Sequence, residues 1–281
     1  MPSARTLLFT AMAMLAFAAN SLLCRLALKE TSIDAVSFTA LRIASGAFAL
    51  WLIMVARGTG GMRGQGSWTS ALALFTYAAA FSWAYLELSA ATGALLLFGA
   101  VQVSMFSWAL WRGERLGAAQ WIGFAIALAG LAGLLLPGVQ APPWQGALLM
   151  IVAGCAWGVY SLRAQGVGDP TVVTAGNFIR ALPFALALGA ALYPWARFDG
   201  AGAVYALLSG ALASGVGYAI WYAALPGLRA SSAATVQLSV PLLAAVGGLL
   251  VLGEPITLRL VLAGAAIIGG IALVLRKSPP R

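Results

Sequence analysis

The side chains best suited to bind a solute are polar and aromatic residues that interrupt long apolar runs. Two such groups have the spacing of one helical face and lie 140 positions apart, namely Phe17, Asn20 and Ser21, and Trp157, Tyr160 and Ser161. A solute that leaves water needs hydrogen-bond partners, which these side chains can supply. Hydrogen bonds between packed helices explain Asn20 and Ser21 equally well, so the sequence leaves both interpretations open.

Further aromatic residues lie deep in other apolar runs. Tyr77 and Phe81 are four positions apart, and Tyr218 and Trp221 are three apart in a later run. Aromatic walls can stack on a flat side chain while hydroxyl and indole groups orient its polar end. Anchoring at a membrane interface is the alternative. We expect it of aromatic residues nearer the ends of their runs, namely Tyr85, Tyr222, Trp68, Trp111 and Trp121.

Two glutamines also interrupt apolar runs. Burying an amide without a partner costs about 2 kcal/mol or more, so Gln102 and Gln237 should each face a cavity or another polar group. Pro241 follows Gln237 by four positions, and a proline there frees a carbonyl and permits a kink. We therefore predict a hinge at Pro241.

Arg42 and Arg180 are the cations inside apolar runs. A cation at mid-depth of a bilayer costs at least ~2.5 kcal/mol, so each needs a reason. Attraction of a substrate carboxylate is one. Binding of neighbouring carbonyls or snorkelling is the other, and the presence of one arginine in each half of the chain favours it. We predict structural charges here, and a cavity contact at Asn177, one turn before Arg180.

Catalytic groups are scarce. The chain has no histidine and seven acidic residues, and none of the acids lies near the middle of an apolar run. The commonest metal ligand and general base are therefore missing, and no nucleophile with its base can be assembled. We expect no enzyme, no metal and no cofactor.

Composition places the chain in a lipid bilayer. Hydrophobic residues make up 62%, charged residues 8%, and the mean hydropathy is +0.95, whereas soluble domains carry about 25% charged residues. Crossing a ~30 Å core takes roughly 20 apolar residues. Ten such helices are predicted, at 6–27, 34–56, 68–88, 93–111, 117–136, 145–165, 171–193, 202–224, 231–252 and 257–275. The net charge of +9 is spread between these runs, which indicates topology and no nucleic-acid partner.

The ten helices form a duplicated unit. Ser21 and Ser161 differ by 140 positions, as do Glu114 and Glu254, while Arg42 and Arg180 differ by 138. We therefore predict repeats at 1–136 and 145–281, with a linker at 137–144 rich in proline and glycine. Five helices per unit make the second unit enter the membrane from the opposite side, so the repeats are inverted. The predicted fold is an all-α membrane protein whose two inverted five-helix repeats enclose a central cavity.

The distribution of basic residues predicts orientation. With the N-terminus inside, ten Lys and Arg residues fall in inside segments and four in outside segments, while two lie within helices. Basic residues collect on the cytoplasmic side. Both termini are therefore expected in the cytoplasm, with the chain a multi-pass protein of a bacterial inner membrane.

These residues resemble the drug/metabolite transporter superfamily with tandem EamA-type domains. The resemblance covers nearly the whole chain and rests on duplicated features, namely Phe17 with Ser21 and Trp157 with Ser161, Arg42 and Arg180, Phe81 to Tyr85 and Tyr218 to Tyr222, and Glu114 and Glu254. Within it, the chain looks most like the bacterial aromatic-amino-acid exporters. The resemblance implies an inner-membrane carrier that exports aromatic or apolar amino acids and related metabolites.

Transport by alternating access is the predicted function, by a monomer that takes a small-molecule substrate. Proton antiporters usually place a titratable carboxylate in the path, so its absence from the middle of every run favours a facilitator. A proton-coupled drug/metabolite antiporter is the alternative, and a non-transporting membrane scaffold is a further one.

Overall fold

The computed structural model describes residues 3–59, 65–113, 117–138, 141–164, 168–228 and 236–275, and these form helices and no strand. The first half contains α1 (Ala4–Glu30), α2 (Ala35–Ala56), α3 (Trp68–Glu87), α4 (Ala90–Trp111) and α5 (Ala118–Leu135). The second half contains α6 (Trp144–Arg163), α7 (Pro170–Ala191), α8 (Gly200–Leu208), the π-helix η2 (Ser209–Val216), α9 (Gly217–Ala224), α11 (Ser239–Leu252) and α12 (Leu258–Val274). Because α8, η2 and α9 form one continuous span, the ten predicted helices are confirmed.

Many helices begin where a polar side chain caps them. Side-chain oxygens accept hydrogen bonds from the first-turn backbone N–H groups at Ser3, Asp34, Ser67, Ser89, Asp169, Asp199 and Thr257. Such caps satisfy donors that have no partner within the helix. The helix starts therefore leave few backbone donors without a partner.

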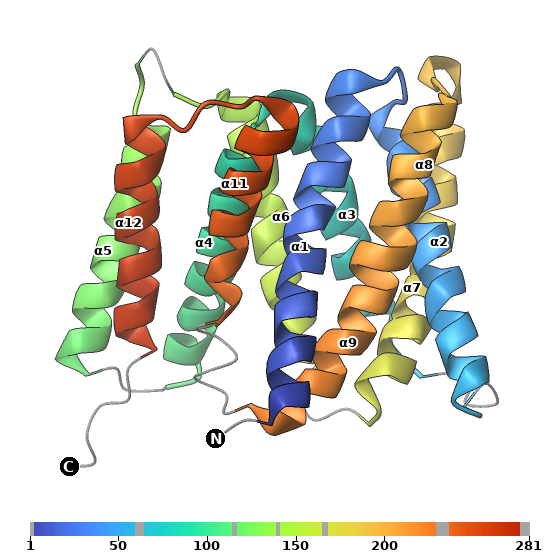
Figure 1. Ribbon diagram of the computed structural model, residues 1–281, viewed down its shortest axis with the longest axis horizontal. Coiled ribbons are helices and arrows are strands. Elements are labelled where there is room, and N and C mark those ends of the chain that lie inside the picture. Colours follow the sequence, from blue (N-terminus) through green and yellow to red (C-terminus); the bar gives the residue numbers. More distant parts are fainter. Residues whose placement is uncertain are drawn as a thin grey trace.

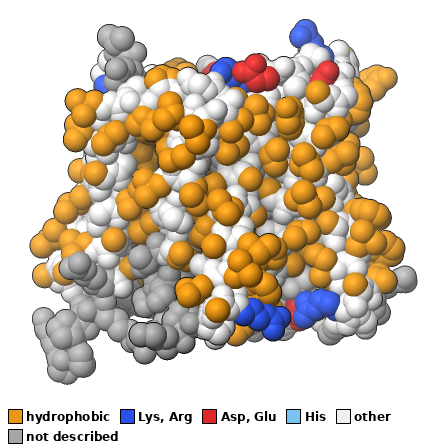
Figure 2. Space-filling model, viewed as in Figure 1, with side chains coloured by type: hydrophobic (Ala, Val, Ile, Leu, Met, Phe, Trp, Pro, Cys, Tyr) orange, Lys and Arg blue, Asp and Glu red, His pale blue; other side chains and the backbone are white. Residues whose placement is uncertain are grey.

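The exterior is that of a multi-pass membrane protein. Figure 2 shows hydrophobic side chains over the middle of the visible face and charged ones near its two ends. Seven helical spans are long and apolar enough to cross a membrane, while α11 and α12 are apolar but shorter. Helix α3 is not among the seven, and its sequence contains several serine, threonine, tyrosine and tryptophan residues.

The two halves are inverted. In Figure 1 α1 begins at the lower edge, where the N-terminus is marked, whereas the connection from α5 to α6 lies at the upper edge. The packing has matching twofold pairs: α2 against α7, α4 against α11, and α5 against α12. Likewise α3 packs on α6, as the span from α8 to α9 packs on α1. We call the end where α1 begins the N-terminal face, and the other end the opposite face.

Small residues let α5 and α12 approach closely across this twofold axis. A Cβ atom added to Gly123 would lie 2.5 Å from the carbonyl oxygen of Gly270, and one added to Gly270 would lie 2.5 Å from that of Gly123. Side chains larger than hydrogen therefore do not fit at the crossing, as expected for small residues at membrane helix contacts.

The eighth span contains a feature that the sequence pattern did not predict. Eight residues, Ser209–Val216, form a π-helix between α8 and α9. Gly210 and Gly215 in it pack against α2, where a Cβ atom at Gly210 would overlap Ser45 and the carbonyl of Arg42. Segments of π-helix are rare in proteins, and those that occur are often found at functional sites.

Candidate functional site: a central cavity

A cavity of about 740 Å³ lies between the two halves. It reaches from residues at mid-depth, such as Ser21 and Phe81, to residues at the ends of helices on the N-terminal face, such as Arg112, Pro170 and Leu275. Twelve of the thirteen residues predicted to line a cavity do so, namely Phe17, Asn20, Ser21, Tyr77, Phe81, Gln102, Trp157, Tyr160, Ser161, Tyr218, Trp221 and Gln237. They come from α1, α3, α4, α6, α9 and the residues just before α11.

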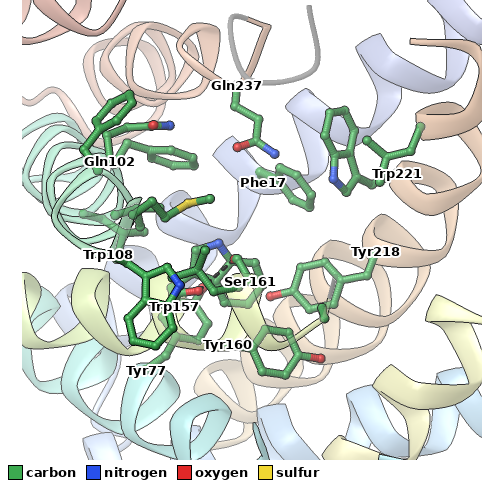
Figure 3. A pocket seen from close by; sticks show the side chains of 18 of the residues that line it. Phe17, Tyr77, Gln102, Trp108, Trp157, Tyr160, Ser161, Tyr218, Trp221 and Gln237 are labelled. Carbon is green, nitrogen blue, oxygen red and sulfur yellow. Dashed lines mark hydrogen bonds between the residues drawn. The ribbon is translucent and has the colours of Figure 1, made fainter. Parts of the chain in front are cut away.

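Aromatic rings surround Trp157. Its ring centroid lies 4.9 Å from that of Tyr77, 5.2 Å from that of Tyr160 and 5.3 Å from that of Tyr218. Phe17 approaches Tyr218 edge-on at 5.8 Å, and Figure 3 shows these side chains around a common space. Rings at such separations attract each other, so the wall is pre-formed and offers π faces to an apolar or aromatic group.

A hydrogen-bonded network fixes the inner end of the cavity. Asn20 Nδ2 donates to Tyr77 Oη at 3.2 Å, and Arg42 Nη2 donates to the same oxygen at 2.8 Å. Ser209 Oγ in the π-helix donates to Asn20 Oδ1 at 2.7 Å. The network joins α1, α2 and α3 of the first half to η2 of the second, so it serves both to pack helices and to line the cavity.

Asn177 is the predicted cavity contact that does not line the cavity. Its Oδ1 accepts from the backbone N–H of Ser67 at 2.9 Å, and its Nδ2 donates to Tyr160 Oη at 3.4 Å. Both ends of the amide are therefore used between α7, α6 and the start of α3. Asn177 supports Tyr160 from behind.

Both glutamines line the cavity, and both lie in the upper part of Figure 3. Gln102 comes from α4 and Gln237 from the residues before α11, the twofold counterpart of α4. Helical geometry is interrupted at Leu238, three positions before Pro241. Pro241 therefore lies in the first turn of α11, where its missing N–H costs no helical hydrogen bond. Whether it acts as a hinge stays a prediction.

The two intramembrane arginines differ in their surroundings. Arg180 donates from Nη1 to the carbonyls of Gln65 and Gly176, at 2.6 and 3.0 Å, and its structural role stays a prediction. Arg42 is 2% exposed and lies over the rings of Tyr77 and Phe81, at 5.0 and 4.8 Å from their centroids. Equivalent positions in the repeat have thus acquired different environments.

Some lining residues escaped sequence reasoning. Tyr222, predicted as an interfacial anchor, lines the cavity instead, because the cavity extends to the N-terminal face and so includes residues near the end of α9. Tyr85, which was also predicted as an interfacial anchor, is instead fully buried, and its hydroxyl is directed at the carbonyl of Ala90. Met105 and Trp108 of α4 line the cavity too. Met105 lies three positions after Gln102 and Trp108 three positions after Met105, and each step of three is a helical signal that could have identified them.

Polar contacts join the two halves at the opposite face. Arg25 Nε lies 3.0 Å from Glu254 Oε1, and its Nη1 donates to the carbonyls of Tyr85 and Leu86 at 2.8 and 3.0 Å. Glu254 Oε2 also accepts from the backbone N–H of Ala90 at 2.7 Å. The contacts connect α1, α3 and α4 of the first half to the loop between α11 and α12, at the end of the bundle that the cavity does not reach.

Known proteins resemble the chain in sequence and in fold. Residues 144–276 match the model of the EamA-like transporter family. The uncharacterized protein PA1977 of Pseudomonas aeruginosa is 61% identical over 275 residues, covering 98% of this chain and 96% of that protein. The threonine/homoserine exporter RhtA of Salmonella typhimurium is 36% identical over 144 residues, about half of either chain (48% and 47%). A solved protein crystal structure shares the fold of this chain, with a TM-score of 0.69 and 20% sequence identity. The superposition covers 98% of each of the two chains.

Proposed function

We propose that this protein, which belongs through residues 144–276 to the EamA-like transporter family, is an exporter. Its substrates are amino acids with apolar or aromatic side chains. Residues 1–136 and 145–281 would be two EamA-type units that work as one monomeric carrier. The single observation that carries the proposal is the central cavity of about 740 Å³ with its aromatic wall and polar inner end. That volume is within the range of about 300–1,000 Å³ typical of small-molecule sites.

The asymmetry between the two ends supports alternating access. The cavity extends to the N-terminal face, whereas Arg25 and Glu254 link the halves at the opposite face. By sequence, ten Lys and Arg residues fall in segments predicted on the side of the N-terminus and four in segments on the other side, which favours a cytoplasmic location for the N-terminal face. The structure then corresponds to an inward-open state, and rocking of one half against the other would expose the cavity to the other side.

The similarity to RhtA supports amino acids as the substrate class, although it covers about half of each chain. The aromatic wall favours larger apolar side chains over threonine and homoserine. Among the described residues, the lining contains no aspartate or glutamate, which favours a facilitator over the alternative, a proton-coupled antiporter.

Flux from liposomes tests the proposal. Purified protein is reconstituted with labelled phenylalanine, leucine, threonine or homoserine inside, and efflux is compared with that from protein-free vesicles. We expect faster efflux, with phenylalanine and leucine ahead of the two hydroxylated amino acids. Efflux equal to that of empty vesicles for all four would reject the function. Accumulation that follows an imposed pH gradient would favour the antiporter.

A further inference from the structure

Arg42 is a buried cation without a carboxylate partner in the described part of the chain. The ion pairs there are made by Arg25, Lys29 and Arg57. Arg42 Nη2 donates to Tyr77, but its Nη1 is buried and has no hydrogen-bond partner among the described residues. A buried charge that is not neutralised is costly, so the charge of Arg42 favours a negatively charged group nearby.

The guanidinium lies directly behind the cavity wall. It stacks on the rings of Tyr77 and Phe81, at 5.0 and 4.8 Å, and both residues line the cavity. Arg112 is the charged residue among the described lining, and no acid accompanies it. The charge of Arg42 is separated from the cavity by the thickness of one aromatic ring. In surroundings of low dielectric constant, its electrostatic attraction for an anion in the cavity is strong at that distance. The inner end of the cavity therefore favours a negatively charged group.

The hydroxyl of Tyr77 accepts two hydrogen bonds and keeps a proton of its own that it can donate to a solute. Its oxygen accepts from Arg42 Nη2 and from Asn20 Nδ2, and both are groups that only donate. Asn20 is held in this orientation because its Oδ1 accepts from Ser209. With its lone pairs occupied, the phenol still has its own proton to give, and donation from a cation to the oxygen strengthens that donor.

The repeat provides an internal comparison. Arg180, the counterpart of Arg42, binds the carbonyls of Gln65 and Gly176. Arg42 instead binds the hydroxyl of a cavity-lining tyrosine, so the two arginines of the repeat differ in the kind of group they contact.

We propose that Tyr77, backed by Arg42 and oriented by Asn20, forms a subsite for the carboxylate of the substrate. This rests on the proposed function for the identity of the solute, but the subsite itself requires only an aromatic or apolar carboxylate. Tyr77 touches the anion, and Arg42 acts through Tyr77 as a positioning residue.

The test uses calorimetric binding to the purified full-length protein with three probes: phenylalanine, phenylalaninamide and phenylacetate. The amide lacks the carboxylate, and phenylacetate lacks the amine. We expect phenylalanine and phenylacetate to bind more tightly than the amide. Tyr77→Phe should weaken the two carboxylates roughly 10-fold to 100-fold, as expected for a lost charge-assisted hydrogen bond, and leave the amide unchanged. Tyr85→Phe is the matched control, because its hydroxyl faces the carbonyl of Ala90 outside the cavity.

Three results would overturn the subsite. The first is equal affinity for phenylalanine and its amide, and the second is an equal loss of affinity for all three probes in Tyr77→Phe. The third is that neither carboxylate binds. Arg42→Lys should lower carboxylate affinity while keeping the charge, and the elution profile of the variant reports whether it folds. Phenylacetate binding that depends on Tyr77, together with absent amino-acid flux, would reject the proposed substrate and retain the subsite.

Discussion

Replacement of Glu254 by glutamine should release the closed opposite face. Glu254 accepts from Arg25 at 3.0 Å and from the N–H of Ala90 at 2.7 Å, and the side chains of Arg25 and Glu254 are only 12% and 8% exposed. A glutamine has one carbonyl oxygen and no charge, so it cannot keep both bonds at full strength. A hydrogen bond to a charged group contributes about 1.5–3 kcal/mol. Since the contact joins the two halves, that energy stabilises the inward-open state against the outward-open one.

The equilibrium should therefore move toward the outward-open state by a factor of roughly 10 to 150. The assay labels a cysteine in the cavity, Ser161→Cys with Cys24 and Cys155 replaced by alanine, using a membrane-impermeant maleimide applied from the opposite face. The rate of labelling should rise by that factor in Glu254→Gln.

Glu30→Gln is the matched control, since Glu30 is an exposed acid at the same face in a surface pair with Lys29, and such pairs contribute about 0–1 kcal/mol. Its labelling rate should match that of the parent. Equal rates in Glu254→Gln and the parent would refute the idea that this ion pair closes the opposite face.

Two further outcomes concern stability. Gly270→Val should destabilise the fold by about 1–3 kcal/mol, because its Cβ would meet the backbone of Gly123 and Ala127. Gly269→Val is the control, since a Cβ there has open space, and it should leave thermal unfolding in detergent nearly unchanged. Similar shifts in the unfolding temperature of both variants would argue against close α5–α12 packing. At the opposite face, partial burial would raise the pKa of Asp34, but hydrogen bonds from Ser37, Arg197 and Val36 together hold it below its ordinary value. The stabilisation from Asp34 is thus present above the unfolded pKa of about 3.9 and is lost as pH falls through the folded value. The difference in melting temperature between the parent and Asp34→Asn should therefore shrink on acidification. A difference that does not depend on pH would contradict this.

Only the tertiary structure distinguished residues that look alike in sequence. Asn177 and Asn20 are both amides inside apolar runs, yet one binds Ser67 and Tyr160 behind the wall and the other lines the cavity. Which face of a helix meets the hollow depends on how the helices are rotated against each other, and periodicity alone leaves that rotation undetermined. The π-helix Ser209–Val216 and its bond to Asn20 escaped prediction for a similar reason, since close packing of Gly210 on α2 supports it.

The sequence by itself indicated the spans, the duplication and twelve of the residues that line the cavity. The bilayer accepts only long apolar helices whose backbone bonds are internal, so composition and run length predicted ten spans directly, and polar or aromatic interruptions such as Gln102 and Trp157 indicated the path between them. Only the tertiary structure decided that the cavity reaches one face, that Arg25 and Glu254 link the other, and that Arg42 and Arg180 differ. These features depend on contacts between residues far apart in the chain, whose energies appear only once the two halves are packed together.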